Sequence, residues 1–262
     1  MEQGKVYLVG AGPGDPELLT LKAVKAIGRA DVLLVDDLVN PAILDYAGKT
    51  ARIIPVGKRG GCRSTAQDFI ERLMIAEARA GRCVVRLKGG DPFIFGRGGE
   101  ERSHLMAEGI AVEVINGISS GLAAPTTLGV PLTHRAYSAG AIFITGHERD
   151  DGAGRTDWAQ LAATGLTLVI YMGVARCRAI ELALLAGGMD PRMPVAVIEG
   201  ATGERQRQLL TTLGRLSEDL AESGLASPAI IVIGEVVRCA SAVQSPLCTS
   251  QELAQPWQNN MM

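Results

Sequence analysis

Residues 84–101 read VVRLKGGDPFIFGRGGEE. The apolar start predicts a buried strand that ends at Lys88, and the turn Gly89-Gly90-Asp91-Pro92 follows directly. Open α/β proteins bind their ligands just beyond the carboxyl ends of their strands. This turn is therefore predicted to face a ligand. Arg97 and two acids come next, where a helix is expected to begin.

Short runs rich in Val and Ile alternate with amphipathic stretches on both sides of this segment. Apolar runs without polar alternation, separated by helices, indicate a parallel sheet that is covered on both faces. In the first half, the pattern predicts strands at 5–10, 31–36, 51–57, 83–88 and 112–117, with helices at 18–29, 67–80 and 99–108.

The same pattern restarts after a segment dense in Gly, Ser, Pro and Thr at 117–133. Strands are predicted at 141–147, 167–173, 194–201 and 228–237, and helices at 158–163, 176–186 and 216–220. The predicted fold class is α/β, with two tandem domains at 1–135 and 136–240. A cleft between them is the natural ligand site. The tail at 241–262 is polar and without periodicity, so we expect it to be mobile.

Composition excludes several classes of function. The 262 residues carry a net charge of −2 and only 4% aromatics, which disfavours nucleic acid as a partner. Neither a secretory signal nor a long uninterrupted apolar run is evident, so we expect a cytoplasmic protein without a membrane span. The five scattered cysteines and three histidines show no metal-ligand spacing, so no metal is expected.

The first strand runs into a second glycine cluster, Gly10-Ala11-Gly12-Pro13-Gly14-Asp15-Pro16. It is similar to a dinucleotide fingerprint, with Asp36-Asp37 about 20 residues further on for a ribose. However, Asp15 would face the pyrophosphate, and two prolines remove backbone N–H donors. S-adenosylmethionine, which carries a sulfonium and an ammonium, suits this loop better. A tight strand-to-helix turn without a ligand stays open as the structural alternative.

These segments together resemble the tetrapyrrole methyltransferases, and within that family the signature of the uroporphyrinogen-III C-methyltransferases. The resemblance extends over roughly residues 4–240 and follows the order of the family's motifs. The matching segments are LVGAGPGDPELLTLKA (8–23), VDDLVN (35–40), KRGGCRSTAQ (58–67), RLKGGDPFIFGRGGEE (86–101), NGISSGLAAPTTLGVPLTHR (116–135), TGH (145–147), YMG (171–173) and SPAIIVIGEVV (227–237).

The resemblance implies an enzyme made of two α/β domains, with the active site in the cleft between them and a homodimeric assembly. The implied reaction is S-adenosylmethionine-dependent C-methylation of uroporphyrinogen III at carbons 2 and 7, which gives precorrin-2 through precorrin-1 and releases S-adenosylhomocysteine. The product feeds cobalamin, sirohaem or haem d1 synthesis, and the sequence leaves this choice open.

The resemblance also implies roles for individual residues. The implied cofactor contacts are Pro13, Gly89, Gly90, Asp91, Ile94, Ser119, Ser120, Met172 and Ala201. Ser119-Ser120 and Gly200-Ala201-Thr202 depart from the commoner residues at two of these positions. The implied substrate contacts are Arg97, Glu100, Arg135 and Met172, and proton transfer is implied for Asp36 and Lys58.

The chemistry of the reaction refines these roles. Attack by a pyrrole carbon leaves a cationic ring that must lose a proton, for which Asp36 and Glu100 are the candidate bases. Arg97 is expected to position substrate, because a guanidinium stays protonated. Between residues 52 and 102 there are eleven Lys or Arg against six Asp or Glu, which suits a substrate with eight carboxylates. Within this stretch we assign Arg59, Arg63 and Arg97 to the substrate, and Arg72 and Arg79 to an exposed helix face. Outside it, we also assign Arg135 to the substrate, because all four of these arginines lie beside glycine or proline turns.

Two other functions remain as alternatives. One is a sister methyltransferase that acts on precorrins later in corrin synthesis. The other is a non-catalytic tetrapyrrole- or nucleotide-binding protein, in which the glycine loops only bind.

Overall fold

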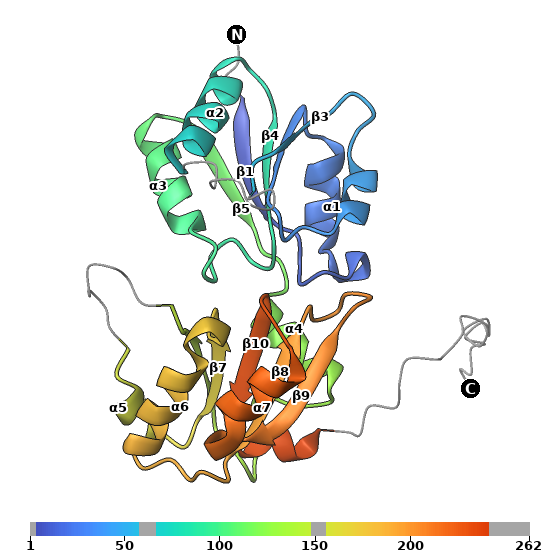
Figure 1. Ribbon diagram of the computed structural model, residues 1–262. Helices are drawn as coiled ribbons and strands as arrows, with labels where there is room; N and C mark the ends of the chain where they lie inside the picture. Colours follow the sequence, from blue (N-terminus) through green and yellow to red (C-terminus); the bar gives the residue numbers. More distant parts are fainter. Residues whose placement is uncertain (1–3, 58–66, 148–155, 241–262) are drawn as a thin grey trace, which may run out of the picture.

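The structure, a computed structural model, describes residues 4–57, 67–147 and 156–240. It consists of two α/β domains, one above the other in Figure 1, each built on a five-stranded sheet. The predicted fold class is therefore confirmed. The tail at 241–262, which was predicted to be mobile, lies outside the described residues.

The first sheet is parallel, and its strands lie in the order β3-β2-β4-β1-β5. The strands are β1 (Lys5–Gly10), β2 (Val32–Val35), β3 (Arg52–Pro55), β4 (Val84–Lys88) and β5 (Ala111–Ile115), each within a few residues of its prediction. Gly10 pairs with Lys88 in register, so the two glycine clusters leave the sheet at the same level. They meet at its carboxyl edge, as parallel pairing requires.

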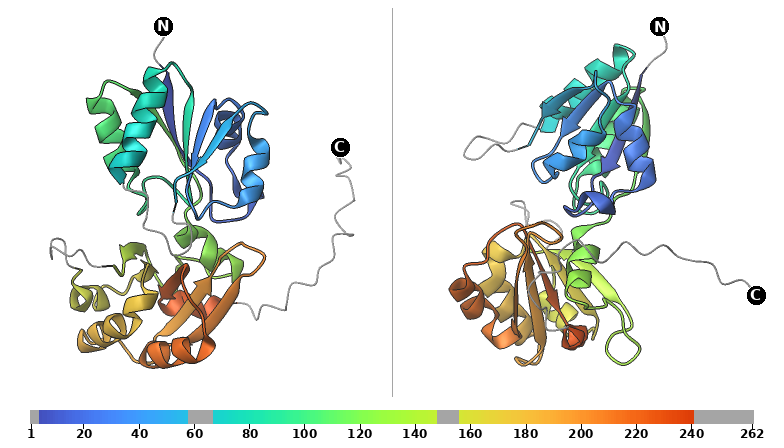
Figure 2. Two further views of the ribbon diagram at one scale, coloured as in Figure 1. Left: turned by 45° about the horizontal axis from the view of Figure 1, so that its top comes forward. Right: turned by 90° about the vertical axis from the view of Figure 1, so that its right-hand side faces the viewer.

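Helices cover both faces of this sheet. α1 (Leu21–Gly28) and the 3-10 helix η2 (Pro41–Tyr46) pack on one face, and α2 (Gln67–Arg79) and α3 (Gly98–Ala107) pack on the other (Figures 1 and 2). Every residue of β2 is buried as a result. Burial on both faces explains why the strand sequences show no alternation.

The second sheet is mixed, in the order β6-β7-β10-β8-β9. Only β6 (Ala141–Thr145) and β7 (Thr167–Tyr171) are parallel, whereas β10 (Ala229–Ile233), β8 (Pro194–Glu199) and β9 (Arg207–Thr212) pair antiparallel. The restarted pattern did not predict this change, because β8 and β10 are as continuously apolar as parallel strands. β9 was missed: its sequence RQLLTT is half-exposed at the sheet edge and lacks an apolar run.

On one face of the second sheet lie α5 (Trp158–Ala162), α6 (Cys177–Ala186) and α7 (Leu216–Ser223). The opposite face is covered by α4 (Ser120–Thr127) and the 3-10 helix η5 (Glu235–Cys239). The remaining 3-10 turns are η1 (Pro16–Leu18), η3 (Val174–Arg176) and η4 (Leu213–Arg215).

α4 lies within the segment at 117–133, dense in Gly, Ser, Pro and Thr, for which no helix was predicted. Its core contacts, through Ala124 and Leu128, are with the second sheet. The division of the chain at residue 135 stays a prediction, and this packing favours an earlier division, between β5 and α4. A helix with an internal proline and a glycine-rich start carries little local helical signal.

Candidate active site

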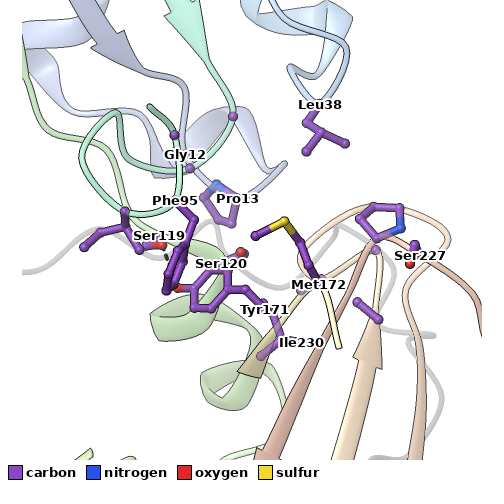
Figure 3. A pocket seen from close by; sticks show the side chains of 18 of the residues that line it. Gly12, Pro13, Leu38, Phe95, Ser119, Ser120, Tyr171, Met172, Ser227 and Ile230 are labelled. Carbon is purple, nitrogen blue, oxygen red and sulfur yellow. Dashed lines mark hydrogen bonds between the residues drawn. The ribbon is translucent and has the colours of Figure 1, made fainter. Parts of the chain in front are cut away.

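A cavity of about 330 Å³ lies between the two domains, at the carboxyl ends of the first sheet's strands. This volume is in the range of small-molecule sites. The wall from the first domain, called the glycine wall here, is formed by Gly12, Pro13, Gly89 and Gly90, and the opposite side-chain wall by Tyr171, Met172, Ile198 and Ile230. Figure 3 shows both walls, with Leu38 and Pro13 from the first domain and Met172 from the second.

Backbones approach one another closely in the glycine wall. The amide of Gly90 donates to the carbonyl of Gly12 at 2.7 Å, and the reverse bond measures 3.2 Å. A Cβ on Gly117 would lie 2.2 Å from the Gly90 carbonyl oxygen, and one on Gly10 would lie 2.6 Å from it. Three chain segments can therefore meet here only because all three carry glycine.

The first glycine loop also contacts the second domain. The amide of Asp15 donates to the hydroxyl of Thr202 at 3.1 Å, and Asn40 Nδ2 donates to the Gly14 carbonyl at 2.7 Å. The Asp15 carboxylate accepts from the amide of Glu17 and caps η1. Asp15, the residue that disfavoured the dinucleotide interpretation, is thus the N-cap of η1. An acidic N-cap agrees with a loop that does not bind phosphate.

Tyr171 organises the side-chain wall, although the sequence analysis assigned it no role. Its hydroxyl is hydrogen-bonded to Ser119 Oγ at 2.7 Å and accepts from the amide of Gly121 at 2.8 Å. Phe95 packs on its ring, with 4.7 Å between the centroids (Figure 3). Burial raises the pKa of Tyr171, so the hydroxyl keeps its proton and can donate to Ser119.

Met172 and Phe95, which face the cavity, have left-handed backbones with φ of 54° and 52°. Arg97, with φ of 56°, belongs to the same turn as Phe95. Such conformations are costly for residues other than glycine and concentrate at functional sites. Gly96 and Gly98 hold the turn closed, because a Cβ on either would lie less than 3 Å from the Pro92 carbonyl oxygen.

Eight of the nine implied cofactor positions line this one cavity: Pro13, Gly89, Gly90, Ile94, Ser119, Ser120, Met172 and Ala201. The ninth, Asp91, is buried beneath it. Its carboxylate accepts from the amides of Phe93 (2.8 Å) and Gly117 (3.1 Å) and from Asn116 Nδ2 (3.2 Å). Asp91 thus fixes the turn to the end of β5 instead of facing the cavity.

The residues assigned to substrate and proton transfer are more dispersed. Asp36 lines the cavity. Arg97 and Glu100 lie outside its lining and pair with each other, Arg97 Nε and an Nη each donating to Glu100 Oε2 at 3.0 and 2.6 Å. Arg135 is exposed in a turn closed by His134 and Ser138. Lys58, like Arg59 and Arg63, lies outside the described residues.

Several of the basic residues between 52 and 102 are paired with acids instead of being open to a ligand. Arg52 and Arg82 both pair with the buried carboxylate of Glu77, and Arg79 pairs with Glu108 at 2.7 Å. The hydrogen bond with Glu100 raises the pKa of Arg97 further, which excludes a base role for its guanidinium. The expected role of Arg97 in positioning remains compatible with this geometry.

Lys88 is a cavity residue that the sequence analysis did not assign. It is buried at the end of β4, and desolvation lowers the pKa of its ammonium below the ordinary value, with the charge of Arg86 as the next cause. Its Nζ lies 3.1 Å from Glu101 Oε1. The sequence feature that could have revealed Lys88 is the presence of two cations, Arg86 and Lys88, within an apolar strand, because such a strand is expected to be buried.

A family model for tetrapyrrole (corrin/porphyrin) methylases matches residues 5–217. The chain belongs to this family. It is 57% identical to a uroporphyrinogen-III C-methyltransferase of Pseudomonas aeruginosa, covering 94% of this chain and 99% of that protein. The resemblance stated from the sequence motifs is therefore confirmed.

Solved structures of the family share the fold. The crystal structure of uroporphyrin-III C-methyltransferase from Thermus thermophilus, complexed with S-adenosylhomocysteine, has a TM-score of 0.77 and 43% identity, covering 90% of this chain and 99% of that one. A cobalt precorrin-4 methyltransferase superposes with a TM-score of 0.80 but only 26% identity, covering 89% and 95% of the two chains.

The described residues of this methylase include no helix that is both long enough and apolar enough to cross a membrane. The same residues contain no group of three His, Cys, Asp or Glu side chains arranged to hold a metal ion.

Proposed function

We propose that this chain transfers methyl groups from S-adenosylmethionine to uroporphyrinogen III, at carbons 2 and 7, giving precorrin-2 through precorrin-1. The observation that carries the proposal is the convergence of eight implied cofactor positions on one cavity of ligand size. Five separate segments of the chain, from both domains, contribute these positions. The relatives at 57% and 43% identity, which bear the name of this activity, support the assignment.

The cavity residues fit S-adenosylmethionine. Glycines at 12, 89 and 90 allow a ligand to lie against the backbone of this wall, because they carry no side chain. Ile94, Met172 and Ala201 offer apolar contacts for an adenosine, and the two serines offer hydroxyls for polar groups.

When bound, the cofactor supplies an electrophilic methyl group on a sulfonium. The protein's own contribution is alignment of this methyl with the pyrrole carbon, which a cavity with walls from two domains favours. Asp36 is the described acid that lines the cavity, so it is the better placed of the two candidate bases. Glu100 is paired with Arg97 outside the cavity lining, and we assign it to holding that arginine for the substrate carboxylates. Arg135 and Lys58 remain predictions for substrate and proton transfer.

A sister enzyme that methylates a later precorrin is the second candidate. Fold similarity does not separate the two, because the precorrin-4 methyltransferase superposes as well as the uroporphyrin enzyme does. Sequence identity separates them, since it falls from 43% to 26% between these two structures. The glycine-rich signature at 86–101, typical of the uroporphyrinogen enzymes, favours the same choice.

A time course analysed by mass spectrometry tests the proposal. With uroporphyrinogen III and excess S-adenosylmethionine, we expect a transient species with one added methyl group that converts into a product with two. Two cofactors should be consumed for each tetrapyrrole. An end point at one methyl group, or reaction only with already methylated precorrins, would replace this function by that of the sister enzyme.

Three finer features belong to the same proposal. The homodimer is tested by light scattering on the purified chain, for which a mass of about twice 27.5 kDa is expected. Cytoplasmic location stays the expectation stated from the sequence. The proposal leaves cobalamin, sirohaem and haem d1 synthesis open as destinations of the product.

A further inference from the structure

Strand β4 carries two cations into the interior of the first domain. Arg86 and Lys88 are two residues apart, so both side chains leave the same face of the sheet. Their side chains are only 3% and 5% exposed. Buried charges of this kind are costly unless they are paired and hydrogen-bonded. Their partners therefore reveal what the two cations do.

The shared partner is Glu101, the neighbour of the glutamate that the motif analysis had selected. Glu101 reaches the sheet from α3 and is fully buried. Its Oε1 accepts from Gln67 Nε2 at 2.9 Å, from Lys88 Nζ at 3.1 Å and from Arg86 Nε at 3.3 Å. One carboxylate thus fixes both cations of β4, whereas Glu100 lies on the exposed side of the same helix.

Arg86 extends from this buried carboxylate to the cavity. One Nη donates to Asp36 Oδ2 at 3.1 Å, and the other donates to the Leu87 carbonyl at 3.3 Å. The second oxygen of Asp36 accepts from the amide of Asp37 at 3.0 Å. Both oxygens of the cavity-lining carboxylate are therefore held, one by backbone and one by a guanidinium that Glu101 itself holds in place.

We infer that Arg86, fixed by Glu101, is the positioning residue that holds the Asp36 carboxylate at the wall of the cavity. A planar guanidinium can hydrogen-bond two carboxylates at once, which a lysine ammonium does less well. The four charges also balance: two cations, Arg86 and Lys88, face two carboxylates. The inference rests on the proposed function and on the role of Asp36 as the proton acceptor.

A double-mutant cycle tests the inference. Turnover with uroporphyrinogen III and the affinity for S-adenosylhomocysteine are measured for wild type, Arg86→Lys, Asp36→Asn and the double variant. We expect Arg86→Lys to lower kcat at least about tenfold, within the usual contribution of general acid–base catalysis. Cofactor affinity should stay within about threefold, and in the Asp36→Asn background the further loss of kcat should be below about twofold.

A matched pair of glutamate variants separates positioning from damage to the fold. Glu101→Gln and Glu77→Gln each remove the charge of a buried carboxylate that holds two cations. The cations held by Glu77 are Arg52 and Arg82, and neither they nor Glu77 line the cavity. We expect Glu101→Gln to lower kcat in the same Asp36-dependent way as Arg86→Lys. Glu77→Gln should leave kcat near wild type even if its melting temperature falls.

Each remaining outcome has a definite meaning. Equal losses of kcat from Arg86→Lys with and without Asp36 would overturn the inference, because Arg86 would then act independently of the carboxylate. So would an unchanged kcat in Arg86→Lys, or a wild-type kcat in Asp36→Asn. Methylation by wild type confirms the proposed function in all of these cases, whereas its absence refutes that function separately.

Discussion

The glycine wall of the cavity is built from backbone, whereas the side-chain wall is built from hydroxyl, aromatic and thioether groups. The first is supported by Gly10 and Gly117, which do not line the cavity but contact Gly90 so closely that a single methyl group would separate the three chain segments. In the second, Tyr171 connects Ser119, Gly121 and Phe95 through two hydrogen bonds and a ring contact. A wall of backbone cannot adapt to an added atom, while a wall of side chains can repack. Substitutions should therefore have larger effects in the glycine wall.

The largest effect is expected for Gly117→Ala. The new Cβ would lie 2.2 Å from the Gly90 carbonyl oxygen, which belongs to backbone that a hydrogen bond from Gly12 holds in place. Overpacking of this kind should weaken S-adenosylhomocysteine binding at least about 100-fold, or about 2.7 kcal/mol. Calorimetric titration measures this affinity, with thermal melting recorded in parallel.

Gly99→Ala is the matched control, since a Cβ there meets nothing within 4 Å and the position is helical. It should keep the affinity and raise stability slightly, because alanine favours a helix more than glycine does. A folded Gly117→Ala variant with wild-type affinity would show that the glycine wall tolerates side chains, and would remove the contrast between the two walls.

Asp91→Ala should have the next largest effect. The carboxylate does not line the cavity, but it accepts two hydrogen bonds, from Asn116 and Gly117, that attach the Gly89-Gly90 turn to the end of β5, and one from Phe93 within its own turn. Loss of these three part-buried hydrogen bonds removes what fixes the turn, at about 0.5–1.5 kcal/mol for each bond. We expect cofactor affinity to fall by more than about tenfold in calorimetry. Affinity within about threefold of wild type would mean that the turn holds its shape without Asp91.

Tyr171→Phe sharpens the comparison from the other wall. It removes the bonds to Ser119 and Gly121 but keeps the ring that Phe95 covers. A moderate loss of cofactor affinity, about three- to tenfold, is expected for one or two neutral hydrogen bonds. Ser119→Ala serves as the partner in a double-mutant cycle, because the two hydroxyls share one bond and their effects should not add. Additive effects would separate Tyr171 from Ser119.

The smallest effect on cofactor affinity is expected for Arg97→Ala, since Arg97 lies outside the cavity lining and pairs with Glu100. Methylation should nevertheless be lost, because we assign this guanidinium to substrate carboxylates. Arg97→Lys should restore little activity, as an ammonium cannot form the same bidentate contact. Wild-type turnover in Arg97→Ala, or a loss of cofactor binding instead, would contradict the assignment.

The contrast between the walls also explains what the sequence could predict. The glycine wall consists of short motifs that follow strands in parallel register. The strand ends were predicted from the apolar pattern, and the resemblance to the family implied Pro13, Gly89 and Gly90 as contacts of one ligand. Tyr171 and Lys88 were not assigned, because a tyrosine or lysine in an apolar strand gives no sign of its partners. Glu100 was selected as a candidate base and substrate contact, whereas Glu101 is the buried acid. The sequence could not separate these two residues, because neighbours at the start of a helix differ only in the face of the helix on which they lie.

The fold shows the same division. All five strands of the first sheet were predicted within a few residues, because βαβ units produce clear apolar runs. In the second sheet, antiparallel pairing of β10 and β8 depends on which strands meet, and continuous apolar runs do not encode that choice. α4 and β9 were missed, since Pro125 weakens one signal and edge exposure the other.

The central claim is that the two walls together enclose S-adenosylmethionine, and a crystal structure of this chain with S-adenosylhomocysteine tests it most directly. The account predicts a ligand that contacts the backbone of Gly89 and Gly90 on one side and Met172 on the other, with the Asp36 carboxylate facing the sulfur side of the cavity. A ligand bound elsewhere, or held by one wall with the other left in solvent, would contradict the account.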